Sequence, residues 1–283
     1  MQKQPNKFIF KPVVSIAAIL VIIIFVGVIK INFLEKKPIT TPLIINSSEG
    51  IVIAKIELPK DTTAAMDMIG LIVYQGRVYT QTGTKMRAES AESLLGEKLG
   101  TTKGTIDEWS KQEDYAVEFA STIGKGDVFA VKGYDKNFRI MTYQRINETI
   151  YSEFYECFSG ITVKTGFDIF SKLKIANNIK TAKYENFESW NYNKQQYNEL
   201  TKFDALNNLV NELKNTIPYT QESLSYLWDD KGEQNQKFMY ITLKDGSEVQ
   251  LRLFKNGYIY YDCSHIIFKI EHPAFNKLWS ELT

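Results

Sequence analysis

The chain has 283 residues, of which 44% are hydrophobic and 13% aromatic, with 34 basic and 33 acidic side chains and two cysteines. This composition is typical of a folded protein with one or two hydrophobic cores, and it excludes an intrinsically disordered chain. Both signs of charge are scattered along the sequence. Because nucleic-acid binding needs a clustered positive surface, we expect no nucleic-acid partner.

An uncharged apolar segment runs from Pro12 to Ile29, between Lys11 and Lys30. As a helix it rises about 27 Å, close to the hydrocarbon thickness of a bilayer. A cleaved signal peptide has a shorter apolar core followed by a small-residue cleavage site, and no such site follows here. The sequence therefore favours a retained anchor over a removed signal, with residues 1–11 as a cytoplasmic stub and residues 12–33 as a single transmembrane helix.

The orientation of this helix depends on the charges that flank it. Three lysines lie on each side, so the positive-inside rule is nearly balanced, and the free amino group tips it toward a cytoplasmic N-terminus. A large C-terminal domain can be exported whatever its charge. We therefore expect an integral cell-membrane protein whose C-terminal domain is extracytoplasmic. The inverted arrangement, a regulator that faces the cytoplasm, remains open.

Residues 34–50 are predicted to form a linker, and residues 51–158 a β-rich module. In this module short apolar runs alternate with glycines, and Gln75-Gly76 between two such runs is a favourable hairpin turn. Regularly spaced short strands predict a small barrel or a strongly curved sheet. The expected strands cover residues 51–58, 68–74, 77–81, 98–106, 127–131, 138–143 and 149–157.

Glycine clusters at residues 96–104 and 123–127 invite comparison with phosphate-binding loops. Neither cluster ends in Gly-Lys-Ser/Thr, so the glycines are better explained by turns and bulges of a curved sheet. We predict no nucleotide and no other cofactor.

The β-rich module resembles part of a known group of proteins. The segments Ile69–Tyr79, Leu95–Gly100, Ile123–Tyr134 and Phe138–Ile140 are similar to a pattern found in uncharacterised membrane-anchored or lipid-anchored extracytoplasmic proteins of Gram-positive bacteria. The resemblance implies a location at the cell envelope. It brings no assigned activity, and the chain departs from lipid-anchored members because it has a helix in place of the acylated cysteine.

Residues 159–283 are predicted to form an α+β module. Apolar residues from Leu200 to Ile217 follow a helical period, and Thr201 with Asp204 fits a capping box. Residues 239–261 read as three antiparallel strands joined at Asp245-Gly246 and Asn256-Gly257. A last helix begins near Pro273. The expected fold class is thus α+β: a β-rich, barrel-like module, then an antiparallel meander with helices packed on it.

The two cysteines, Cys157 and Cys263, have two interpretations. In an exported domain they can form a disulfide, and otherwise they are buried free thiols. Cys263 and His265 are spaced like half of a metal site, but the chain has only two histidines and lacks further ligands at zinc spacing. We predict no metal site.

An aromatic-rich stretch, residues 184–197, is the strongest candidate for ligand contact. Five of its rings alternate with amides and carboxylates and can stack on sugars or peptides; the alternative is a surface hairpin or strand whose rings cover a sheet edge. These candidates are Tyr184, Phe187, Trp190, Tyr192 and Tyr197.

No catalytic residue is predicted, because no nucleophile–base pattern or carboxylate pair stands out in the sequence. We therefore expect a membrane-anchored binding, sensing or structural module at the cell envelope, with a cell-wall or envelope-protein ligand. An enzyme is the less favoured interpretation. Its form would be an envelope hydrolase that uses a carboxylate pair invisible in the sequence.

Overall fold

The structure is a computed structural model that describes residues 44–56, 69–107, 110–229, 235–271 and 273–282, which all belong to one compact unit. The predicted anchor, residues 12–33, lies outside the described residues. Within the described ranges, no helix has the length and apolar character needed to cross a membrane.

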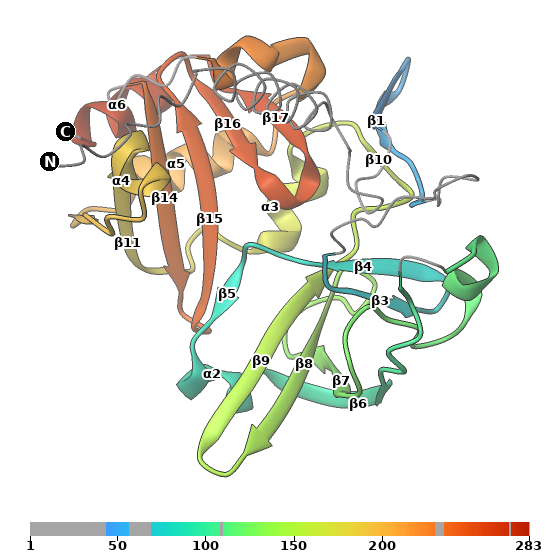
Figure 1. The fold of residues 1–283 in the computed structure, drawn as a ribbon. Coiled ribbons are helices and arrows are strands. Elements are labelled where there is room, and N and C mark those ends of the chain that lie inside the picture. Colours follow the sequence, from blue (N-terminus) through green and yellow to red (C-terminus); the bar gives the residue numbers. More distant parts are fainter. Residues whose placement is uncertain (1–43, 57–68, 108–109, 230–234, 272, 283) are drawn as a thin grey trace, which may run out of the picture. The chain divides into compact units, whose positions relative to one another are not determined.

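The first large sheet has six antiparallel strands and occupies the predicted β-rich module (Figure 1). The turn at Gln75-Gly76 is confirmed: the two residues have φ of 50° and 65° and join adjacent strands. Residues 119–122 form backbone hydrogen bonds with residues 71 and 73, in the strand at one edge of the sheet, and with residues 103 and 106, which follow the strand at the other edge. Because the same segment bonds to both edges, the sheet curls. In spatial order the strands are β3 (Leu71–Tyr74), β4 (Arg77–Gln81), β9 (Thr149–Glu156), β8 (Arg139–Ile146), β7 (Asp127–Val131) and β6 (Leu95–Thr101).

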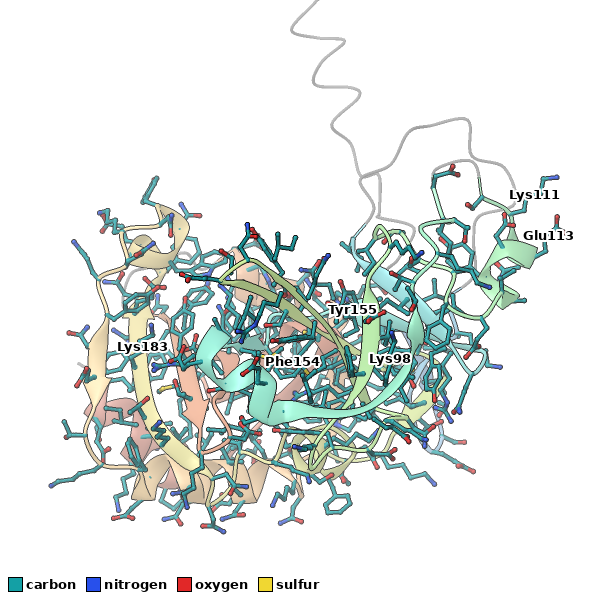
Figure 2. All side chains as sticks on the ribbon, turned by 90° about the horizontal axis from the view of Figure 1, so that it is seen from below. Lys98, Lys111, Glu113, Phe154, Tyr155 and Lys183 are labelled. Atoms are coloured by element: carbon teal, nitrogen blue, oxygen red, sulfur yellow. The ribbon has the colours of Figure 1, made fainter. Side chains whose placement is uncertain are left out.

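Side chains on β8 and β9 alternate between two small cores. Phe154 packs with Met141 and Leu94, whereas its neighbour Tyr155 packs with Ile140 and other residues on the opposite side of the sheet (Figure 2). This is the period-2 alternation of a strand that is buried on both faces. Two short helices accompany the sheet: α2 (Ala88–Leu94) and the 3-10 helix η1 (Gln112–Ala116).

The second large sheet has eight strands and carries the predicted meander. The turns at Asp245-Gly246 and Asn256-Gly257 are confirmed, with glycine φ of 89° and 86°. In spatial order its main path is β12 (Asn198–Leu200), β11 (Ile179–Asn186), β14 (Gln236–Leu243), β15 (Ser247–Phe254), β16 (Tyr258–Tyr261), β17 (Ile266–Lys269) and β13 (Pro218–Thr220).

Three helices cover one face of this second sheet and complete the main hydrophobic core (Figure 1). They are α3 (Phe167–Leu173), α5 (Asp204–Leu213) and α6 (Pro273–Glu281). The start of α6 at Pro273 agrees with the prediction. Helix α5 is shorter than predicted, and its N-cap is Phe203 without a side-chain cap, so the capping box at Thr201 is wrong.

The opposite face of the second sheet carries two short elements that cover it only in part. Helix α4 (Phe187–Asn191) lies against β11 and β14, and the 3-10 helix η2 (Glu222–Trp228) packs on β15, β16 and β17 through Leu224 and Leu227. A third 3-10 helix, η3 (Asp262–Ser264), follows β16. The surface between α4 and η2 is where the candidate site lies.

Two further pairings tie the halves of the chain together. A three-stranded sheet combines β1 (Ile44–Ser47), β2 (Gly50–Ile53) and β10 (Ile161–Val163), and the short strand β5 (Lys85–Met86) pairs with β15. The α+β fold class with a curled sheet is confirmed for the described residues. The strands of the first large sheet precede residue 158 and those of the second follow it, except β5, whereas β2 and β10 pair across this position. Residues 44–47 and 50, which were predicted to belong to the linker, lie in β1 and β2.

Candidate functional site

The site begins with the register of the second sheet. Phe238 on β14 is opposite Arg252 on β15, and Arg252 is opposite Tyr260 on β16. Directly opposed residues of an antiparallel pair face the same side, so these three side chains form a row on the face that the main core does not use. The alternate residues, such as Met239 and Leu251, point into that core.

Arg252 is the centre of this row. Its guanidinium carbon lies 5.0 Å from the ring centre of Phe238 and 5.5 Å from the ring centres of Trp190 and Trp228. Its Nε and Nη2 donate hydrogen bonds to Oε1 of Gln236, at 2.9 and 2.5 Å. Burial lowers the pKa of Arg252 below its ordinary value, because the charged form loses hydration.

No carboxylate pairs with Arg252 among the described residues. Half-buried arginines usually have an anionic partner, because removing a charge from water is unfavourable. Among the described residues, its ring contacts are aromatic faces and its side-chain hydrogen bonds go to one amide oxygen. The guanidinium therefore keeps the capacity to bind an anion with its remaining N–H groups.

Two tryptophans flank the arginine. Trp190 of α4 stacks on Phe238, with ring centres 4.2 Å apart and planes at 7°, and Trp228 at the end of η2 packs edge-on against Tyr260 at 5.3 Å. We call the resulting hollow the aromatic groove. It has a volume of about 300 Å³, and its defining residues are Trp190, Trp228, Phe238, Arg252, Tyr260 and Asp262.

The polar end of the groove lies where β16 meets η3. The hydroxyl of Tyr260 is 3.0 Å from Oδ1 of Asp262 and 3.3 Å from Oε1 of Gln221, and it donates to these acceptors. Burial and then the Asp262 carboxylate raise the pKa of Tyr260. The tyrosine is therefore a neutral donor at physiological pH, and Asp262 is the carboxylate of the groove.

A second arginine lies in a sealed cluster between the two large sheets. Arg139 on β8 and Glu156 on β9 are both fully buried, and Nε and Nη2 of Arg139 donate to Oε1 of Glu156 at 2.9 and 2.5 Å. Tyr261 on β16 donates to Oε2 of Glu156 at 2.7 Å, and Thr84 lies 2.9 Å from the Tyr261 hydroxyl. Burial, the largest single effect, disfavours the charged arginine, but Glu156, Tyr134 and Tyr261 together raise the pKa of Arg139.

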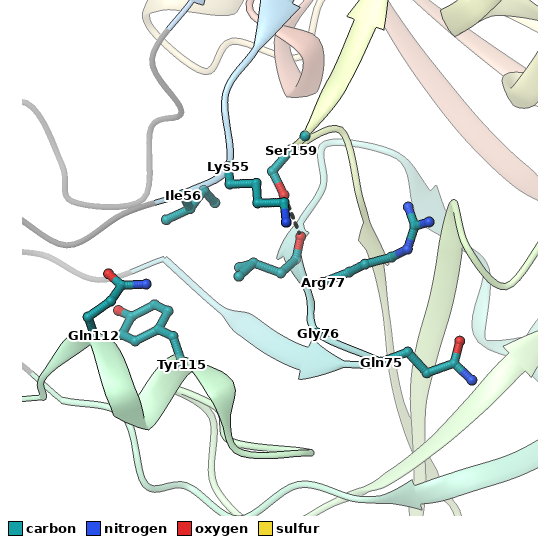
Figure 3. A pocket seen from close by; sticks show the side chains of 10 residues that line it. Lys55, Ile56, Gln75, Gly76, Arg77, Gln112, Tyr115 and Ser159 are labelled. Carbon is teal, nitrogen blue, oxygen red and sulfur yellow. Dashed lines mark hydrogen bonds between the residues drawn. The ribbon is translucent and has the colours of Figure 1, made fainter.

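A third region, a basic hollow of about 400 Å³, lies at the turn between β3 and β4. Its lining includes Lys55, Arg77 and Tyr115, and Ser159 donates a 3.4 Å hydrogen bond to the Val78 carbonyl. Figure 3 shows the Tyr115 hydroxyl and the Arg77 guanidinium pointing away from each other. Because binding sites need polar groups that converge, we prefer the aromatic groove.

The structure separates the five aromatic residues that the sequence singled out. Trp190 lines the groove, and Phe187 packs against it with ring centres 6.0 Å apart. Tyr184 is buried in the main core on the opposite face. Tyr197 packs edge-on against Tyr240, and Tyr192 is 68% exposed. The stretch is the end of β11, the short helix α4 and a loop that leads to β12, so neither a single hairpin nor one long strand describes it.

Both cysteines are free thiols in the structure. Cys157 is buried beside Ser159, and Cys263 accepts a hydrogen bond from the backbone N–H of Gly83 at 3.2 Å. Burial raises the pKa of both thiols, to about 12 for Cys263. Across the described ranges, no three His, Cys, Asp or Glu side chains are grouped as they would be around a metal ion.

Sequence reasoning missed most of the groove. Trp228, Phe238, Arg252, Tyr260 and Asp262 are spread over 35 residues and share no motif. The one sequence signal that could have located the groove was the pair of hairpin turns, Asp245-Gly246 and Asn256-Gly257. Their positions determine which residues of β14, β15 and β16 are opposite one another. Comparison with known proteins found no matching family model, no matching curated protein and no matching solved structure.

Proposed function

We propose that this protein is a membrane-tethered, extracytoplasmic binding protein and that the aromatic groove is its ligand site. The observation that carries the proposal is Arg252, a half-buried cation between aromatic rings without a carboxylate partner among the described residues. A ligand that offers an anionic group to Arg252 and a flat or apolar group to the tryptophans would satisfy both features.

The predicted alternative, an envelope hydrolase, has less support. Such enzymes place two carboxyl groups on opposite sides of the scissile bond. Asp262 is the one carboxylate among the described residues that line the groove. A cation among aromatic rings fits recognition of an anion better than acid–base hydrolysis.

The matched pair benzoate and benzamide tests the groove, because both have a flat ring and only benzoate has a negative charge. We expect benzoate to change the tryptophan fluorescence of the full chain in detergent in a saturable way, with benzamide binding at least about tenfold more weakly. Arg252→Gln should remove this preference. The control Arg87→Gln changes an exposed arginine that is paired with Glu89 and should leave it intact.

Two results would contradict the ligand proposal: equal binding of benzoate and benzamide, or equal effects of the two arginine substitutions. A further control is Trp279→Phe, which removes a tryptophan packed on Phe275 at 5.4 Å, at the helical core. The fluorescence change should persist in that variant, because its source is the groove.

The location is tested separately. A reporter that is active only outside the cytoplasm, fused after Thr283, should be active, and protease added to intact cells should shave the C-terminal domain. A silent reporter on a protected chain would invert the topology. It would also turn the search for a ligand toward the cytoplasm.

A further inference from the structure

The groove contains a second unpaired charge besides Arg252. Asp262, the first residue of η3, accepts a hydrogen bond from Tyr260 but forms no ion pair with a lysine or arginine of the described residues. Nearby His265 does not neutralise it, because burial, opposed by Asp262, lowers the pKa of that imidazole below its ordinary value. The carboxylate therefore remains available as an acceptor.

Arg252 and Asp262 line the same groove without pairing with each other. Arg252 is opposite Tyr260, and Asp262 follows Tyr260 by two residues, so the two charged side chains start from neighbouring positions of the sheet face. A cation and an anion held in one hollow and left apart are complementary to a ligand that carries both charges.

We infer that the ligand is a zwitterion of amino-acid size: its carboxylate binds Arg252, its ammonium binds Asp262, and its apolar side chain lies against the tryptophans. The inference rests on the proposed function and names its ligand class. The volume of about 300 Å³ is at the lower end for small-molecule sites, which suits one amino acid.

Other anionic ligands match the groove less completely. An acidic sugar can stack on a ring and pair with Arg252, but it supplies no cation for Asp262. A neutral sugar satisfies neither charge. An ammonium group also gains from the faces of Trp228 and Tyr260, since aromatic rings attract cations.

Three related compounds separate these cases: L-phenylalanine, N-acetyl-L-phenylalanine without the ammonium, and L-phenylalanine amide without the carboxylate. Titration calorimetry of the full chain in detergent should show that phenylalanine binds at least about tenfold more tightly than either derivative, since each derivative loses one charge-assisted contact. Asp262→Asn should abolish the discrimination against the N-acetyl compound. Arg252→Gln should abolish the discrimination against the amide.

Glu153→Gln is the matched control, because it removes an exposed carboxylate on β9 and should change none of these affinities. If the N-acetyl compound binds as tightly as phenylalanine, or if Asp262→Asn has no effect, the amino-acid inference fails while the anion site at Arg252 stands. If none of the three compounds binds and benzoate also fails, both the inference and the proposed function are overturned.

Discussion

Arg139 and Arg252 lie in chemically similar surroundings and differ in their ionic partners. The guanidinium carbon of Arg139 is 4.3 Å from the ring centre of Tyr134 and 4.9 Å from that of Phe154, much as Arg252 is surrounded by Phe238 and two tryptophans. Arg139 has Glu156, which forms two hydrogen bonds with it and excludes water. Arg252 has the neutral amide of Gln236 in that place.

The difference shows how one type of side chain serves two purposes. At the junction of the two sheets a buried carboxylate neutralises Arg139, although Nη1 of that arginine has no hydrogen-bond partner among the described residues. Tyr261 extends this ion pair from the second sheet. On the open sheet face Arg252 forms no ion pair with a carboxylate of the described residues, and we propose that a ligand supplies the anion there. The predictions below test this contrast between a sealed and an open arginine.

The largest effect is expected from Glu156→Gln. This substitution leaves Arg139 buried without a counter-charge, and breaking a buried pair on one side usually costs about 3–5 kcal/mol of unfolding free energy. Urea unfolding of the full chain measures the cost. The control Glu92→Gln removes the exposed partner of Arg145 and should cost less than about 1 kcal/mol. Equal costs would mean that the sealed pair contributes no more than a surface pair.

Tyr261→Phe should have the next largest effect. It removes a hydroxyl that donates to Glu156 and lies 2.9 Å from Thr84, and buried groups that lose a partner cost about 1–3 kcal/mol. Tyr226→Phe removes the hydroxyl of a residue that is 51% exposed and should change stability by less than about 0.5 kcal/mol. A Tyr261→Phe protein as stable as the control would show that the hydroxyl does not hold the two sheets together.

Arg252→Met should cost less than Glu156→Gln. No buried carboxylate is left unpaired, and the loss is mainly the hydrogen bonds to the buried amide of Gln236, or about 1–3 kcal/mol. The same variant should lose the preference for benzoate over benzamide. If Arg252→Met lowered the free energy of unfolding as much as Glu156→Gln does, Arg252 would be a residue that stabilises the sheet and not one that binds a ligand.

The smallest effect concerns pH. Because burial lowers the pKa of His265 in the folded protein, the unfolded chain binds a proton first as the pH falls. The neutral His265 contributes fully to the free energy of unfolding above the ordinary histidine pKa of about 6.5. This contribution is lost as the pH falls toward the lowered pKa of His265 in the folded protein. His265→Asn tolerates the left-handed backbone, with φ of 53°, and should lose less stability between pH 7.5 and 5.5. If the unsubstituted protein and His265→Asn lost the same stability between pH 7.5 and 5.5, the histidine would be excluded as the cause of the pH dependence.

The hairpins were predictable because their turns have a local cause. Gly76, Gly246 and Gly257 each adopt a positive φ, which glycine reaches without strain, and each follows a polar residue between apolar runs. The apolar stripe of α5 and the proline at the start of α6 are local signals of the same kind. These features established the α+β class and the meander.

The groove and the sealed pair depend on contacts between distant residues. Glu156 and Tyr261 meet although they are 105 positions apart, and Trp190 reaches Arg252 from helix α4. Tyr184 and Trp190 lie in one aromatic stretch, yet the end of β11 and the start of α4 send them to opposite faces of the sheet. The aromatic composition of residues 184–197 singled out this stretch in the sequence. Which of its rings faces the groove depends on how the strands pair in the fold.

The most direct test of the account compares the two arginines in one experiment. Full-length protein labelled with ¹⁵N in arginine can be titrated with benzoate while the side-chain Nε–H signals are recorded. The account predicts a saturable shift of the Arg252 signal and an unchanged Arg139 signal, because one guanidinium is open and the other sealed. An unchanged Arg252 signal, or equal small shifts of every exposed arginine, would contradict the claim that Arg252 forms an anion-binding site.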